Sequence, residues 1–413
     1  MDAGQRPSLE NVFPRISFLM QKKHRLAILL CGAILTVKCQ AEETNFLSTV
    51  KINFLKEVID PQDGKLDVSG YLGKATGFLP IPILITEPAV GIGGGFALLF
   101  FHDSIQNRAE LSKKKKQDGS SVKVPPPSVS GVAGFGTENG TWGGAGFHLG
   151  IWRHDTLRYI GALAYASINY DYYGLQKKIP VNISGALLFQ QLSVRLGDSD
   201  LFLGANYRYS SATAQRENTS GILPPPAEDG VEVASAAASP ILEYDSRDNL
   251  FTPNRGMNAK AEWSHYDTWL GSDNQFDILA LRNRIWFPLK ESWVLGLRLD
   301  GSFSRGDTPF YMLPFVQLRG IPAMRYQGKH VLTAEAELRW DFTPRWSLVG
   351  FAGAGQTSSD SGWNTDDEGM HPAGGFGFRY LIARIFKLRS GVDIGFGEEG
   401  YSIYFITGSA WVW

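Results

Sequence analysis

Residues 401–413 of the chain, YSIYFITGSAWVW, have the composition of a β-strand that continues to the last residue. Five of these residues are aromatic, and the stretch ends in Trp413 with no polar tail. A soluble protein rarely leaves such an edge uncovered, because an apolar strand end promotes aggregation. A bacterial outer-membrane barrel instead needs a final strand that closes its sheet, and Phe405, Trp411 and Trp413 would place rings at the lipid boundary. The stretch therefore favours a membrane barrel, with a terminal strand of a soluble β-sandwich as the alternative.

Residues 20–41, MQKKHRLAILLCGAILTVKCQA, contain the three parts of a secretory signal. A basic KKHR stretch precedes the apolar run LAILLCGAILTV, and Ala41 supplies a small residue for cleavage. The apolar run is shorter than the roughly 20 residues that a membrane-spanning helix needs. We therefore predict cleavage after Ala41, which removes both cysteines of the chain, Cys31 and Cys39.

The composition of the remaining chain excludes several classes of protein. Without cysteines, neither disulfides, nor thiol catalysis, nor a cysteine-ligated metal is expected. The net charge of −1 gives no reason to expect nucleic acid as a partner. The 46 glycines and the 12% share of aromatic residues are both high, while no other segment is apolar over the ~18 residues of a spanning helix. Such an exported chain is typical of a transmembrane β-barrel, whose strands are apolar on one face only.

Apolar and polar residues alternate along several stretches of the C-terminal half. In residues 293–303, leucines at every second position alternate with residues such as Arg298 and Asp300, and residues 332–341 and 386–396 follow the same rule. A strand separates these two sets onto opposite faces, whereas a helix, with its repeat of 3.6 residues, does not. In a soluble sandwich the charged face would meet solvent; in a membrane barrel the apolar face meets lipid and the charged face lines the lumen.

About sixteen segments along the chain are strand candidates, and we predict an all-β fold, a transmembrane antiparallel β-barrel of about 16 strands. The segments are 79–86, 89–102, 128–137, 141–153, 156–168, 181–195, 199–211, 234–245, 256–268, 274–288, 292–305, 330–342, 345–357, 371–382, 385–397 and 401–413. An even number of strands places both ends of the barrel on one side of the membrane. If that side is the periplasm, the short connections fall there, and the long connections 212–233, 306–329 and 358–370 fall outside.

The chain is thereby divided into three predicted parts. Residues 1–41 are an N-terminal extension and signal peptide, residues 42–78 are a short periplasmic segment, and residues 79–413 are an outer-membrane β-barrel. The cell outer membrane of a Gram-negative bacterium is the expected location.

Short motifs stand where this barrel would turn. The connection before the twelfth segment contains Leu318, Arg319, Gly320 and Ile321, and the connection after the eighth contains Asp245, Arg247, Asp248, Asn249, Pro253 and Gly256. With the glycine run at 91–95 and the aromatic C-terminus, their order and spacing resemble the BamA/TamA-like outer-membrane superfamily, the bacterial surface antigen family. The resemblance covers essentially the whole chain after the signal. It implies that the loop before strand 12 folds into the lumen.

The physical chemistry of that loop supports the same expectation. A guanidinium inside a barrel stays charged and favours a carboxylate partner, and Gly320 lets the backbone turn beside Arg319 without a Cβ clash. The next strand offers Glu335 and Glu337 on its inward face as candidate partners of Arg319. The family often has an Asp on strand 13, where this chain has Gly353. Glu335 or Glu337 must therefore serve, or the attachment of the loop is weaker.

The N-terminal segment departs from the family's insertases, which carry periplasmic POTRA domains. Only about 37 residues precede the first predicted strand, fewer than the ~40–60 of an unaided domain. The stretch from Asp60 to Asp67 is rich in Asp, Pro and Gly and predicts a turn. A calcium site formed by its carboxylates is the alternative.

No enzyme motif is present: the sequence has no G-x-S-x-G elbow, no H-E-x-x-H and no P-loop. We predict that the protein is not an enzyme and requires no cofactor or metal. The resemblance implies protein insertion or translocation, or outer-membrane biogenesis. The expected partners are outer-membrane lipids, client outer-membrane proteins or a separate periplasmic chain, and not nucleic acid. The alternative is a plugged or leaky pore, or a surface antigen without an assembly role.

Overall fold

The computed structural model describes residues 58–70, 78–87, 89–102, 128–174, 177–216, 231–358, 369–384 and 386–411. The predicted signal peptide and N-terminal extension lie outside these residues. No helix among them is long and apolar enough to cross a bilayer.

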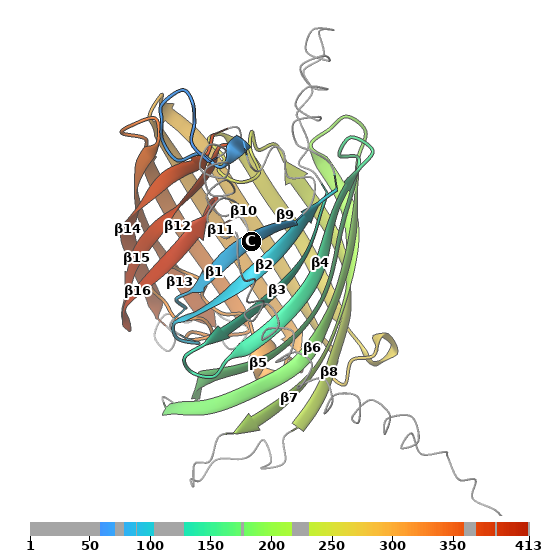
Figure 1. Cartoon of the computed structure of the whole chain (residues 1–413). Helices are drawn as coiled ribbons and strands as arrows, with labels where there is room; N and C mark the ends of the chain where they lie inside the picture. Colours follow the sequence, from blue (N-terminus) through green and yellow to red (C-terminus); the bar gives the residue numbers. More distant parts are fainter. Residues whose placement is uncertain are drawn as a thin grey trace, which may run out of the picture. The chain divides into compact units, whose positions relative to one another are not determined.

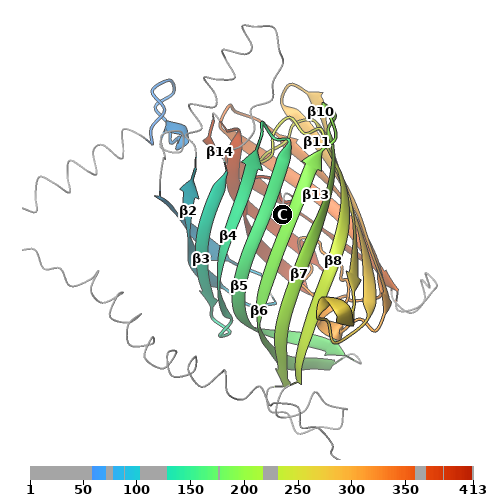
Figure 2. The same cartoon turned by 90° about the vertical axis from the view of Figure 1, so that its right-hand side faces the viewer.

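The described chain forms one antiparallel sheet of sixteen strands in sequence order, which confirms the predicted fold class (Figure 1). The strands are β1 (Phe78–Ile85), β2 (Gly93–Phe101), β3 (Val129–Thr137), β4 (Trp142–Trp152), β5 (Leu157–Gly174), β6 (Lys177–Arg195), β7 (Leu201–Arg216), β8 (Val231–Asp245), β9 (Gly256–Tyr266), β10 (Phe276–Lys290), β11 (Trp293–Gly306), β12 (His330–Trp340), β13 (Trp346–Ser358), β14 (Met370–Ala383), β15 (Leu388–Gly397) and β16 (Gly400–Thr407). Figure 2 shows how the strands tilt together as they pass around the wall.

The two faces of the sheet have the chemistry that the alternation predicts. Leu297 and Leu299 point outward and are 39% and 56% exposed. Asp300, the residue after Leu299, is only 5% exposed. Glu335 and Arg339 on the neighbouring β12 are likewise buried on the inner face. A soluble sandwich would bury the leucines and expose the charges, so its predicted alternative is wrong. The arrangement is that of a membrane barrel.

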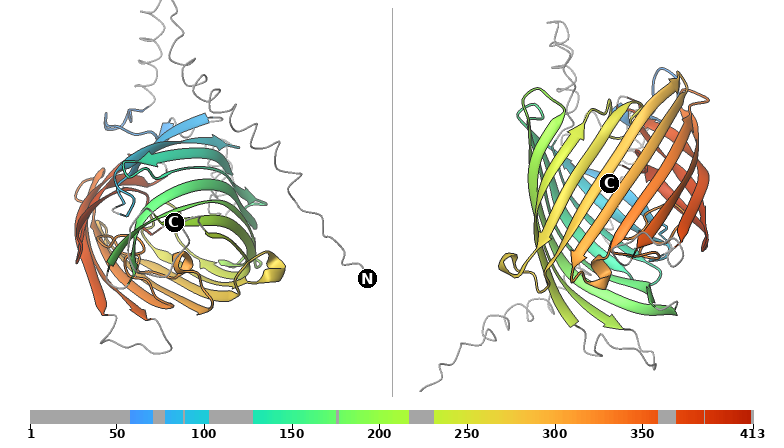
Figure 3. Two further views of the ribbon diagram at one scale, coloured as in Figure 1. Left: turned by 90° about the horizontal axis from the view of Figure 1, so that it is seen from below. Right: turned by 180° about the vertical axis from the view of Figure 1, so that it is seen from behind.

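The barrel has two ends that differ in their connections. Both chain termini of the sheet lie at the end that carries the β4–β5, β6–β7, β10–β11 and β12–β13 turns, which we call the inner end. The opposite outer end carries the long connection 307–329, which we call the plug loop. The end-on view in Figure 3 shows the strands as a ring with β1 (blue) beside β16 (red).

The sheet has a seam where its first and last strands meet. β1 and β16 lie next to one another, but among the described residues β1 is hydrogen-bonded only to β2, and β16 only to β15. Both strands have 8 residues, fewer than the roughly 9–11 that cross a bilayer. The barrel is therefore nearly closed rather than closed.

The predicted strand at 401–413 is wrong in its second half. β16 ends at Thr407, and Gly408, with φ of 88°, turns the chain into the lumen. Trp411 is 4% exposed and donates its indole N–H to Glu335 Oε2 at 2.6 Å. Phe405 does face outward, at 49% exposure, while Trp413 lies outside the described residues. The aromatic composition suits lipid contact and lumen packing equally, so the sequence pattern does not distinguish them.

Candidate functional site

The plug loop, residues 307–329, lies inside the barrel and is anchored by a small apolar cluster. Val316, Leu318 and Ile321 of the loop are 0–5% exposed and pack with Val331 of β12. The N–H of Val316 also donates to the carbonyl of Tyr326 across the loop at 2.9 Å, so the loop has internal structure of its own. A segment with buried apolar residues and internal hydrogen bonds is an ordered plug.

Arg319 attaches the tip of the plug loop to the opposite wall. Its Nε and Nη2 donate to Glu335 Oε1 at 3.0 and 2.7 Å, and Nη1 lies 2.8 Å from Glu337 Oε2. The guanidinium stacks 3.6 Å from the centre of the Phe351 ring. Both glutamates proposed as partners from the sequence are thus within ion-pair distance, on β12.

A third carboxylate, Asp393 of β15, completes this site and was missed by sequence reasoning. Arg319 Nη1 donates to Asp393 Oδ2 at 2.6 Å, and Asp393 is also bonded to Arg379 of β14. Asp393 is 0% exposed. Its alternation with apolar neighbours predicted a lumen-facing carboxylate, but nothing in the sequence ties β15 to a loop 74 residues away.

Two glycines provide the space that this attachment requires. A Cβ on Gly353 would lie 2.4 Å from the carbonyl oxygen of Ala334 and 3.0 Å from Leu318. Gly353 therefore makes room for the plug where the family would place an Asp, and Asp393 supplies a carboxylate from another strand. Gly320 has φ of 107°, and its Cβ would lie 2.6 Å from the carbonyl oxygen of Phe396.

The plug loop also connects both sides of the seam at the outer end. On one side, the backbone N–H of Ala323 donates to Glu87 Oε1, in the β1–β2 turn, at 2.9 Å. On the other side, the N–H of Gly320 donates to the Tyr404 hydroxyl of β16 at 2.9 Å, and Arg325 pairs with Glu399 at 2.6 Å. Burial raises the pKa of Glu87 above its usual value. The loop thus bridges two strands that do not pair directly.

The connection between β8 and β9 is bonded across the inner end of the barrel. Asp248 and Asn249 cap its backbone: Asp248 Oδ1 accepts from the N–H of Asn254, and Asn249 Oδ1 accepts from the N–H of Phe251. Asn249 Nδ2 then donates to the carbonyl of Phe386, in the β14–β15 turn, at 2.9 Å. The sequence predicted a local turn here, whereas the structure shows a bridge across the barrel.

The remaining motif residues of that turn, and the end of the chain, complete the bridge. Asp245 accepts from Arg247 at 2.7 and 3.0 Å. Pro253 is fully buried, and Gly256 returns the chain to β9 with φ of 104°. The N–H of Ser409 donates to the carbonyl of Phe251 at 2.6 Å, which joins the chain end to the turn.

A second bridge lies before β1, in residues 58–70, which we call the strap. Asp60, Asp63 and Asp67 converge on Arg345, in the β12–β13 turn, at 2.5, 2.7 and 2.6 Å. Arg345 is 1% exposed. The carboxylates that could have formed a calcium site therefore surround a guanidinium, and no group of possible metal ligands is found among the described residues.

The strap has a second attachment at the inner end of the barrel. It is bonded to β14 through the N–H of Val68 and the carbonyl of Ile382, at 2.8 Å, and Asp60 pairs with Arg384 after β14 at 2.8 Å. β1 begins at Phe78, eight positions after the strap ends.

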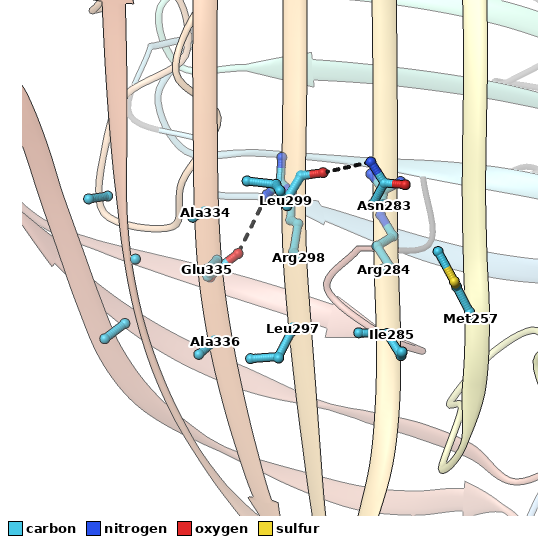
Figure 4. A pocket seen from close by; sticks show the side chains of 13 residues that line it. Met257, Asn283, Arg284, Ile285, Leu297, Arg298, Leu299, Ala334, Glu335 and Ala336 are labelled. Atoms are coloured by element: carbon cyan, nitrogen blue, oxygen red, sulfur yellow. Dashed lines mark hydrogen bonds and ion pairs between the residues drawn. The ribbon is translucent and has the colours of Figure 1, made fainter.

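The outer face near the plug carries a groove lined by small residues. Ala334, Ala336, Leu297 and Ile285 line it (Figure 4). Ala352 and Ala354 of β13 are also among its lining residues. Figure 4 also shows Arg298 joined to Glu335 by a dashed line, which marks their ion pair at 3.5 Å. These two inner-face residues share strands with the groove, so the wall is one sheet thick here.

The fold is similar to that of solved outer-membrane proteins at low sequence identity. BamA from Haemophilus ducreyi lacking POTRA domains 1-3 matches with a TM-score of 0.53 and 13% identity, over 86% of this chain and 81% of that chain. CdiB from Acinetobacter baumannii matches at 0.53 and 8%, over 80% and 59% of the two chains. CdiB from Escherichia coli matches at 0.53 and 10%, over 79% and 61%.

No protein-family model matches the sequence, and no characterised protein matches it by sequence. The similarity at this identity is a similarity of fold. The chain has the fold of these solved barrels, with sixteen antiparallel strands in one sheet and the loop before β12 folded into the lumen.

Proposed function

We propose that this barrel inserts or translocates proteins at the outer membrane, and that the seam between β1 and β16 is where a client strand is received. The observation that carries the proposal is the absence of strand pairing between β1 and β16 in the described chain. Backbone groups left unpaired in lipid cost several kcal/mol each. An added strand from a client would satisfy them by β-augmentation.

The sequence of β1 is suited to weak pairing at this edge. Pro80 and Pro82 have no N–H, and because they are two positions apart, the missing donors belong to the same edge of the strand. β1 is paired with β2 along its whole length. The missing donors cost least if the backbone nitrogens of the two prolines face the seam rather than β2. This edge would then bind a client strand less tightly than an edge with all its N–H donors, and would release the client more readily.

The plug loop bridges the seam at the outer end, and the strap joins β14 to the β12–β13 turn at the inner end, while β1 and β16 remain unpaired. Both bridges are made of ion pairs and hydrogen bonds rather than of continuous sheet. Such contacts can break and re-form without unfolding the barrel. Outer-membrane lipids, client proteins and a separate periplasmic chain with receptor domains are the partners that this function requires.

The experiment is to lock the seam with a disulfide. Cysteine at Leu84, near the outer end of β1, is combined in turn with cysteine at Tyr401 and at Ile403 of β16. All three side chains are exposed on the outer face. The proposal expects that the oxidised pair stops insertion of an unfolded outer-membrane protein into vesicles that contain this barrel, and that a reductant restores insertion.

The matched control links strands that already pair. Leu84 is opposite Gly94 in the β1–β2 register, so a disulfide between cysteines at these positions leaves the seam free. Full insertion by the seam-locked barrel would overturn the proposal. That outcome would favour the second candidate, a plugged barrel or surface antigen without an assembly role.

A further inference from the structure

A polar cavity of about 610 Å³ lies in the lumen between the plug loop and the wall formed by β5 to β12. Gln317 and Phe315 of the plug loop line one side, and Trp411 of the chain end lines another. The proposed seam function does not use this cavity. Its size is sufficient for a small ligand or for a lipid headgroup.

Cationic groups outnumber anionic groups on the cavity wall. Six side chains are cationic and three are carboxylates: Arg208, Arg247, Lys260, Arg282, Arg284 and Arg298, against Glu243, Glu262 and Asp300. Three of these pair with partners of their own, since Arg208 and Lys260 contact Glu262, and Arg247 contacts Asp245. The excess charge is therefore concentrated on β10 and β11.

Three arginines share a single carboxylate at this place. Asp300 Oδ2 lies 2.8 Å from Arg298 Nε, 3.4 Å from Arg284 Nη2 and 4.0 Å from Arg282 Nε. Arg298 has further acceptors, the carbonyl of Gln317 at 2.9 Å and Glu335 at 3.5 Å. Arg282 and Arg284 have no second carboxylate within ion-pair distance among the described residues, so their charges are compensated only in part.

Two polar atoms of the cluster also lack hydrogen-bond partners. Arg284 Nε and Asp300 Oδ1 are both buried, and neither has a partner within the described part of the chain. Figure 4 shows Arg284 and Arg298 on adjacent strands, so one ligand can reach both guanidinium groups. A phosphate group would accept from Arg284 and Arg282, and a proton retained on it would be donated towards Asp300 Oδ1.

We propose that this lumenal cavity is a binding site for a phosphate-bearing ligand, held by Arg282 and Arg284 with Asp300 and Arg298 as supports. Guanidinium groups bind phosphate through paired N–H donors, and in a partly dry lumen each such contact is stronger than in bulk water. The phosphate is either that of a soluble anion or that of a lipid headgroup that enters from the membrane. Both sources present the same group to the same arginines.

The test uses the purified full chain with two probes. Inorganic pyrophosphate is titrated by calorimetry into the protein in an uncharged detergent, and phosphatidic acid is offered in nanodiscs of phosphatidylcholine and counted by native mass spectrometry. Binding of pyrophosphate identifies a soluble source, and retention of phosphatidic acid alone identifies a lipid source. Either result should weaken by about tenfold or more in Arg284→Gln and in Arg282→Gln, because each removes a charged hydrogen-bond donor.

Arg305→Gln is the matched control, since Arg305 lies on β11 but is exposed. It should bind both probes as the wild type does. A readout without substitution is phenylglyoxal labelling of Arg284 in the wild-type chain, which the bound probe should slow. The inference is overturned if neither probe binds at roughly 10 mM, the limit of weak specific binding. It is also overturned if binding is unchanged in both glutamine variants, or if the bound probe leaves the labelling rate unchanged.

Discussion

At the scale of single residues, the attachment of the plug depends on charge placed where water is scarce. Arg319 contacts Glu335, Glu337 and Asp393, from two different strands. Removing Arg319 leaves the buried Glu335 and Glu337 without this cation, and breaking a buried pair in this way costs about 3–5 kcal/mol. The exposed pair of Arg325 and Glu399 is worth only about 0–1 kcal/mol. The plug is therefore held at its buried tip, and its exposed contacts near the seam can be exchanged.

The glycine opposite that tip gives a residue-scale prediction. Gly353→Ala should destabilise the barrel by about 1–3 kcal/mol, because the new methyl group would press on the Ala334 carbonyl and on Leu318. Gly350→Ala on the same strand is the control, since no heavy atom lies within 4 Å of its Cβ position. Samples are heated to increasing temperatures before gel electrophoresis, and the measurement is the temperature at which the band of the folded barrel disappears. Equal temperatures for the two variants would contradict the packing argument.

Residue-scale sequence reasoning predicted part of this site. The inward orientation of Glu335 and Glu337 could be predicted from alternation, and both follow the plug loop on the next strand. Asp393 was not, because its proximity to Arg319 depends on the closure of the barrel and not on any local pattern. Arg345 was not singled out either, since nothing in its turn indicates that three aspartates from the strap surround it.

At the scale of elements, the attachment of the strap to Arg345 depends on pH. The hydrogen bond from Arg345 lowers the pKa of Asp63. Burial acts to raise the pKa of Asp67, but its hydrogen bonds with Ser69 and Arg345 outweigh that effect and leave the pKa lowered. The same ion pairs raise the pKa of Arg345. A carboxylate with a lowered pKa stabilises the docked strap above its unfolded pKa, and that contribution is lost as the pH falls.

We therefore expect the strap to remain docked at neutral pH and to be released only below the ordinary aspartate pKa of 3.8. Hydrogen exchange of the amides in residues 58–70 measures this directly. In Arg345→Gln, protection should already be low at neutral pH, because the three carboxylates would then repel one another. Lys65→Gln, at an exposed position of the strap, should keep the wild-type profile. Unchanged protection in Arg345→Gln would show that the strap is held by other contacts.

Elements were predicted well where one face of the strand meets lipid. All sixteen strands overlap a predicted segment, and alternation marks several of them because lipid on one side and a polar lumen on the other impose a period of two. β5, β6 and β7 extend beyond their predicted ends, to Gly174, Lys177 and Arg216. Strands that project past the bilayer are no longer required to alternate, so their ends are not marked in the sequence. The turn of the chain end into the lumen was missed for a related reason: its tryptophan finds an acceptor that only the folded barrel provides.

At the scale of the whole molecule, the lumen is obstructed at two levels in series. The plug loop occupies the outer part, and the β8–β9 connection crosses to the β14–β15 turn and to the chain end near the inner part. Ions that pass through the barrel must pass both. A pore would not be expected to carry two ordered obstructions, each with its own hydrogen-bonded attachment, whereas a barrel whose route opens sideways at the seam is compatible with both.

Obstruction in series leads to a prediction about conductance in planar bilayers. The wild-type barrel should show no steady large channels. Arg319→Gln should loosen the outer obstruction, and the pair Asp248→Ala with Asn249→Ala should loosen the inner one by removing its backbone caps. Because either obstruction alone still blocks the lumen, the variant that combines all three substitutions should conduct more than the sum of the two partial variants. Steady channels in the wild type, or a combined variant whose conductance is only the sum of the two partial variants, would mean that the two segments do not block one path. Arg305→Gln is the control and should leave the conductance unchanged.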